Sequence, residues 1–237
     1  MPHFQIIDTK GTFTPYRGVS VLASIKADTQ NDFWTALYTA LQKSPLISKY
    51  YSLCDYKTYH MTTLLGFTED EYYPNWHPFV SEQLPFFKEL TTKLDTLAFE
   101  PVITISGGGI DDTLRLIVQL PKEQQRLLES LEKEVGLDKT IPSPMNISLA
   151  YAINKNEIKT FSRAIQNEID TIIRPLKNNQ ILLNTPKLCF FNDKSNFTLW
   201  DGNINPFNFA PPRIFFDKPL IPQPEQTSYE TGCCVLS

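Results

Sequence analysis

The sequence predicts an α+β protein with mostly antiparallel sheets. Apolar runs typical of strands alternate along the chain with amphipathic patterns typical of helices. Several of the expected strands also follow one another through short turns. Short connections favour antiparallel neighbours over a doubly wound parallel sheet.

The first half of the chain is expected to alternate strands and helices after an irregular lead-in over residues 1–15. The expected elements are a strand at Val19–Ile25, a helix that Asp28 and Thr29 cap and that ends before Pro45, a strand at Tyr59–Leu65 closed by Gly66, and a helix at Gln83–Leu94.

The glycine triplet Gly107–Gly109 is expected to form a hairpin turn between strands at Leu97–Ser106 and Thr113–Leu120. A phosphate-binding loop is the alternative, but no helix follows the triplet and no Gly-Lys-Ser/Thr ends it. The remaining expected elements are a helix from Pro121 to Gly136, a strand around Asn146, a helix capped by Asn156 and ended by Pro175, and strands at Leu188–Asn192 and Phe197–Trp200.

Composition divides the chain into a domain over residues 1–210 and an extended, proline-rich tail over residues 211–237. A net charge of −4 argues against a basic surface for long nucleic acid. The four cysteines form no C-x-x-C pair, so neither a zinc site nor a disulfide framework is expected. We expect no metal, no cofactor and no membrane-spanning segment.

Two short segments carry the candidate chemistry. Side chains alternate faces along a strand, so His60 and Thr62 are expected to share one face, and Asn146 and Ser148 likewise. Taken singly, these are ordinary strand residues. The other histidines are His3, in the lead-in, and His77, in a proline-flanked loop.

The order and spacing of four motifs resemble the 2H phosphoesterase superfamily, in a branch marked by a Tyr-His-Met-Thr first motif. The motifs are Tyr16–Val19, Tyr59–Thr62, Thr113–Leu116 and Ile147–Tyr151. The resemblance implies a bilobal fold, with two mostly antiparallel sheets flanked by helices around a central cleft. It also implies metal-free action on a cyclic nucleotide or a related phosphodiester.

In such proteins one histidine from each lobe serves as general base or general acid, and the hydroxyls hold the phosphate. The resemblance therefore makes His60 catalytic and Thr62, Asn146 and Ser148 substrate-binding. The second histidine position holds Asn146, whose amide donates hydrogen bonds but shuttles no proton. Arg115 either binds the phosphate or serves a structural ion pair or an exposed position.

The last four residues, Cys234–Ser237, match a C-a-a-X box that predicts farnesylation of Cys234 by a eukaryotic prenyltransferase. One prenyl chain anchors only marginally, so Cys233 is the candidate for palmitoylation. The alternative is a disordered C-terminus that carries no lipid and has no function. Prenylation implies a peripheral membrane protein in eukaryotic cytoplasm, made by the cell or delivered by an intracellular bacterium as an effector.

Three functions stay open. The first is a lipid-anchored phosphodiesterase with His60 as the surviving acid-base group. The second is a catalytically dead module that binds a nucleotide or phosphorylated lipid. The third is a lipid-anchored interaction scaffold.

The lipid anchor predicts that Cys234→Ser releases the chain from membranes of eukaryotic cells, because the prenyl chain supplies the apolar area that enters the bilayer. Cys233→Ser should keep the prenyl group but weaken retention. Fractionation of cells expressing each variant measures this, and full membrane retention of Cys234→Ser would contradict the anchor.

Overall fold

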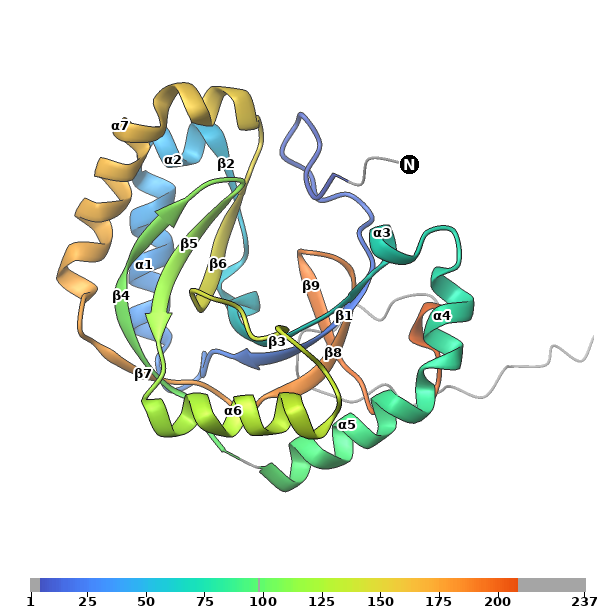
Figure 1. Cartoon of the computed structure of the whole chain (residues 1–237). Helices are drawn as coiled ribbons and strands as arrows, with labels where there is room; N and C mark the ends of the chain where they lie inside the picture. The colour runs from blue at the N-terminus through green and yellow to red at the C-terminus, as the bar shows by residue number, and fades with distance from the viewer. Residues whose placement is uncertain (1–4, 98, 209–237) are drawn as a thin grey trace, which may run out of the picture.

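The computed structural model describes residues 5–97 and 99–208. Within them, nine strands form one curled, antiparallel sheet with helices on its outer side (Figure 1). The α+β prediction is therefore confirmed. The prediction of two sheets needs one refinement, because the two halves are hydrogen-bonded into a single sheet.

The sheet order is β7-β4-β5-β6-β3-β1-β8-β9, and β2 pairs with β6. The strands are β1 (Gly18–Ser24), β2 (Tyr51–Leu53), β3 (His60–Thr68), β4 (Val102–Ile110), β5 (Thr113–Gln119), β6 (Asn146–Ala152), β7 (Gln180–Leu182), β8 (Lys187–Asp193) and β9 (Asn196–Leu199). The helices are α1 (Asn31–Lys43), α2 (Pro45–Tyr50), α3 (Glu69–Tyr72), α4 (Trp76–Glu82), α5 (Leu84–Leu97), α6 (Lys122–Glu134) and α7 (Lys155–Ile173).

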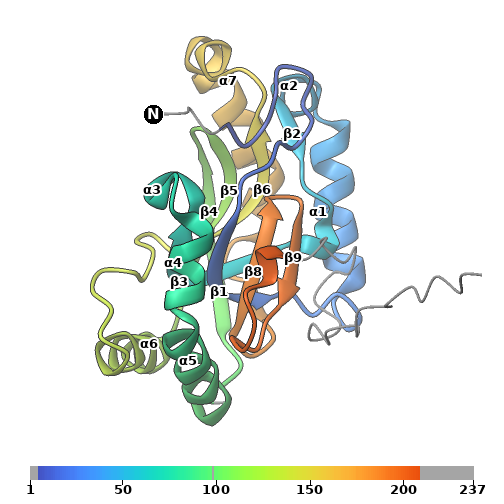
Figure 2. The ribbon, with the colours of Figure 1, turned by 90° about the vertical axis from the view of Figure 1, so that its right-hand side faces the viewer.

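Each half of the sheet packs against its own helices (Figure 2). The larger buried cluster joins β4, β5 and β6 to α1, α2 and α7, with Trp34, Leu116 and Ile165 fully buried. A second cluster joins β1, β3 and β8 to α4 and α5, with Trp76 and Phe87 at its centre. The outer face of the sheet is thus covered by helices on both halves.

The glycine triplet does not form the turn that the sequence predicted. Gly107–Gly109 lie inside β4, and the chain turns at Asp111 and Asp112 before β5. A Cβ atom on Gly108 would come within 2.7 Å of the Ile173 side chain of α7. Glycine is needed there because α7 packs directly on the backbone of β4.

Other boundaries also differ from the sequence-based expectation. Gln30, not Asp28 or Thr29, precedes α1, and Asn154, not Asn156, caps α7 with its side-chain oxygen. The proline-flanked loop expected around His77 is instead the start of α4, because Trp76 and Phe79 pack into the core. The strand of the first motif continues through Gly66 to Thr68.

The proline-rich tail and the C-a-a-X box lie outside the described residues, so the anchor stays a prediction. Among the helices of the described part, none has the length and apolarity that crossing a bilayer requires.

Gly66 lies where β3 and β1 approach each other closely. A Cβ atom there would lie 1.5 Å from the Val19 carbonyl oxygen, whereas one on Gly107 would meet nothing within 4 Å. Gly66→Ala should lower the free energy of unfolding by about 3 kcal/mol, because the two strands must separate. The control Gly107→Ala should change it by less than about 0.5 kcal/mol. Urea unfolding measures both, and equal stability of the two variants would contradict this packing.

Candidate functional site

The candidate site is built on the pairing of the central strands β3 and β6. They pair antiparallel with Met61 opposite Ile147. Continuing this register by one residue in each direction places His60 opposite Ser148 and Thr62 opposite Asn146. The four predicted site residues therefore meet across two adjacent strands.

Burial alternates in the same way over the first four residues of each strand. Met61 and Ile147 are fully buried in the larger core cluster. His60, Thr62, Asn146 and Ser148 are only partly buried. Since successive side chains of a strand point to opposite faces, these four lie on the inner, concave face, opposite to the core.

A β-bulge follows each motif at the same distance. Val21 pairs with Leu64 but Leu22 with Thr62, which leaves Thr63 as an extra residue in β3. Likewise, Leu114 pairs with Ala150 but Arg115 with Ser148, so Leu149 is extra in β6. A bulge re-aims the next side chains, and the second one turns Tyr151 onto the same face as Ser148. The two motifs are thus related as the halves of a pseudo-symmetric pair.

The tautomer of His60 follows from its neighbours. Its Nδ1 atom lies 2.7 Å from the carbonyl oxygen of Thr58. A carbonyl only accepts, so Nδ1 carries the proton and Nε2 carries the lone pair. The ring also packs edge-on against Phe197, with 4.3 Å between ring centroids. His60 is therefore held in the form that can accept a proton at Nε2.

The surroundings of His60 favour its neutral form. The pKa of His60 is lowered to about 4, chiefly by burial; the hydrogen bond to the Thr58 carbonyl opposes this shift, and the positive charge of Lys194 adds a smaller lowering. The imidazole is thus uncharged near neutral pH. A neutral imidazole can act as a base but not as an acid.

The remaining predicted residues complete this face. The Asn146 amide donates to the Pro144 carbonyl over 3.1 Å, which uses one of its two hydrogens. Arg115 lies opposite Ser148 on β5, and its guanidinium is paired with the carboxylate of Asp111. The structural alternative for Arg115, an ion pair, is thus present. Cys233 and Cys234 lie outside the described residues.

Sequence reasoning missed four side chains around this face: Tyr16, Tyr151, Lys194 and Phe197. Tyr16 and Tyr151 belong to the motifs used for the resemblance, but nothing in their spacing assigned them to a site. Tyr151 bonds to the Ser148 side chain, and burial raises its pKa well above the usual value. A lysine in a hairpin turn, such as Lys194, carries no sequence signal.

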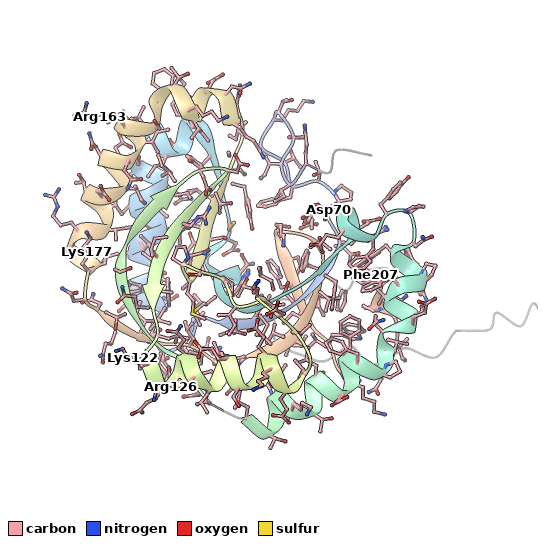
Figure 3. The ribbon with its side chains drawn as sticks, in the orientation of Figure 1. Asp70, Lys122, Arg126, Arg163, Lys177 and Phe207 are labelled. Carbon is pink, nitrogen blue, oxygen red and sulfur yellow. The ribbon has the colours of Figure 1, made fainter. Side chains whose placement is uncertain are left out.

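A pocket of about 640 Å³ adjoins the site. Its lining includes Tyr16 and Tyr151 together with Lys49, Lys155 and Asp70, the last of which is labelled on α3 in Figure 3. Asp70 accepts a hydrogen bond from the Tyr16 hydroxyl over 3.2 Å. The volume suits a ligand of nucleotide size.

Within residues 5–97 and 99–208, no three His, Cys, Asp or Glu side chains gather as a metal site requires.

Comparison with known proteins identifies the fold. No family model matches the chain, and neither does a curated protein. A solved structure of a conserved protein of unknown function from Agrobacterium tumefaciens strain C58 is similar, with a TM-score of 0.57 and 16% identity over 81% of this chain and 88% of that one. This likeness shows a shared fold.

Two structures of Usb1 from Kluyveromyces marxianus also match, each with a TM-score of 0.47. One is 10% identical over 77% of this chain and 96% of that chain. The other, solved with uridine monophosphate, is 9% identical over 80% of this chain and 97% of that chain.

The lowered pKa of His60 predicts a pH-dependent stability. Its folded-state pKa of about 4 lies below the usual value of about 6.5, so protonation favours the unfolded chain. The contribution of neutral His60 is fully present above about pH 6.5 and is lost as the pH falls towards 4. The difference in unfolding free energy between wild type and His60→Gln should shrink over this window, by at most about 1.4 kcal/mol per pH unit. A pH-independent difference would contradict the assigned environment.

Proposed function

We propose that the protein is a phosphodiesterase of the 2H type that hydrolyses a cyclic nucleotide or a related phosphodiester. The observation that carries the proposal is the β3–β6 register, which sets His60 and Thr62 against Ser148 and Asn146 on one partly exposed face. These groups comprise one base, two hydroxyls and one amide, as binding and activating a phosphoryl group requires.

In the proposed reaction, Nε2 of His60 takes a proton from water, and the water oxygen attacks phosphorus. The hydroxyls of Thr62 and Ser148 and the second amide hydrogen of Asn146 donate hydrogen bonds to the phosphoryl oxygens. Fixed donors of this kind stabilise the charge that develops in the transition state. The leaving oxygen still needs a proton, which the amide of Asn146 cannot supply.

The pocket beside this face suits the nucleoside part of the substrate. The rings of Tyr16 and Tyr151 line it, and both tyrosines border the site, Tyr151 through Ser148 and Tyr16 through Lys194. Aromatic side chains accept any base by stacking. Lys49 and Lys155 also line the pocket, but Lys155 is paired with Asp112, and Asp70 and Glu157 line it too, so the pocket has no net positive charge.

A second candidate function is recognition of a nucleotide or phosphorylated lipid without cleavage. Asn146 favours it, because loss of one acid-base partner costs about 10²- to 10⁴-fold in rate. In both candidates a peripheral membrane location is proposed from the sequence of residues 234–237 alone. The prenyltransferase is then a partner only during lipid attachment.

Hydrolysis assays separate the two candidates. Purified wild type should cleave at least one 2′,3′-cyclic nucleotide or linear phosphodiester from a panel, as measured by product chromatography. His60→Ala should lower the rate at least about 100-fold, because the base is lost. Asn146→His should raise it, because an imidazole restores the second proton-transfer group.

His77→Ala is the matched control. His77 lies on α4, where its ring contacts Arg17 and Asn208, so its loss should leave the rate unchanged. Equal rates for wild type and His60→Ala would refute the assigned base. Binding of a nucleotide by wild type without any product, combined with turnover by Asn146→His, would establish the second candidate.

A further inference from the structure

Lys194 lies at the tip of the hairpin between β8 and β9, which Figure 1 shows in the middle of the molecule. Asp193 and Asn196 pair across the turn, and the Asp193 carboxylate accepts a hydrogen bond from the Ser195 backbone over 2.7 Å. The turn is therefore held by its own hydrogen bonds, and the lysine side chain is not needed to form it.

Two aromatic rings hold the ammonium group. The Nζ atom of Lys194 lies 3.8 Å from the ring centroid of Phe191 and 5.2 Å from that of Tyr16. Rings attract a cation through their faces but take no proton from it. Within the described part of the chain, no hydrogen bond or ion pair to the ammonium of Lys194 is found.

The ammonium belongs to the same site as His60. Phe197, three residues further along the hairpin, packs on the His60 ring, and Phe191 packs on Phe197 with 5.2 Å between centroids. The charge of Lys194 is near enough to lower the pKa of His60. The hairpin thus brings a cation within electrostatic reach of the base.

We propose that Lys194 donates the proton to the leaving oxygen, the step for which the second motif has Asn146 in place of an acid. The inference rests on the proposed function. It assigns to the hairpin tip a role that none of the four motifs supplies.

The proton balance of the step is complete. His60 takes one proton from water, the water oxygen bonds to phosphorus, and the bond from phosphorus to the ribose oxygen breaks. The leaving oxygen takes a proton from the ammonium of Lys194, which becomes a neutral amine. Return of the His60 proton to the amine, directly or through water, restores both groups.

The charged surroundings of Lys194 suit this role. Burial lowers its pKa to about 8, while the carboxylates of Asp70 and Glu71 act in the opposite direction. Tyr16, beneath the ammonium, has its pKa raised by burial to about 12 and stays neutral. At pH 7 Lys194 is charged, yet it releases its proton more readily than an exposed lysine with a pKa of about 10.4.

Two substitutions and two substrates test the assignment. Lys194→Met removes charge and proton, whereas Lys194→Arg keeps a charge that cannot be released. On a 2′,3′-cyclic nucleotide, whose alkoxide must be protonated, both should lower kcat by about 10²- to 10⁴-fold. On bis(4-nitrophenyl) phosphate, whose nitrophenolate leaves without a proton, the loss should be less than about 10-fold, because only the acid is missing.

The pH profile gives an independent measure. The wild-type rate on the cyclic nucleotide should fall above about pH 8, and this basic limb should be absent from Lys194→Met. Lys187→Met, on the same hairpin, is the control, because the Lys187 side chain makes an exposed ion pair with Asp95. Its rate and profile should match those of wild type.

Each outcome decides between the claims. Rescue of cyclic-nucleotide hydrolysis by Lys194→Arg, or equal losses on both substrates, would overturn proton donation and leave the phosphodiesterase assignment intact. A Lys194→Met variant with the same activity as wild type would also overturn proton donation and leave the phosphodiesterase assignment intact. Absence of turnover by wild type on both substrates would instead overturn the proposed function, and proton donation with it.

Discussion

The pairing of Met61 with Ile147 is the contact on which the site depends. It joins the two halves of the sheet, and both side chains are fully buried in the larger core cluster. Because side chains alternate along a strand, fixing this pair in the core turns His60, Thr62, Asn146 and Ser148 together to the concave face. A slip of one residue in this register would exchange the site for the core. The stability of the core therefore enforces the geometry of the site.

The two motifs are related by approximate symmetry, which the bulges share and from which one pair of side chains departs. Thr63 and Leu149 follow the two motifs at equivalent positions, so the backbone presents both motifs alike. The side chains differ, with a base at His60 and an amide at Asn146. A second proton-transfer group must then come from outside the pair of motifs. The hairpin that carries Phe197 against His60 also carries Lys194, so one packing contact positions both sides of the proposed reaction.

Much of this arrangement was predictable from the sequence, because it depends on local patterns. The alternation around His60 and Asn146 predicted which residues share a face, and Pro121 and Gly136 bounded α6 well. The failures involve contacts between distant segments. The sequence predicted a turn at Gly108, whereas Gly108 lies inside β4. Its glycine is explained by the packing of α7 on β4, which no local pattern shows. No local pattern predicted a role for Lys194, because its proposed role depends on the curled sheet, which brings the β8–β9 hairpin to His60.

The central claim is that the inner face of the β3–β6 pair binds a phosphoryl group. A crystal structure with a nucleoside 3′-monophosphate tests it most directly. We predict phosphate oxygens about 3 Å from Nε2 of His60 and from the hydroxyls of Thr62 and Ser148. A phosphate bound instead between Lys49 and Lys155 in the adjoining pocket, without contact to His60, would contradict the claim.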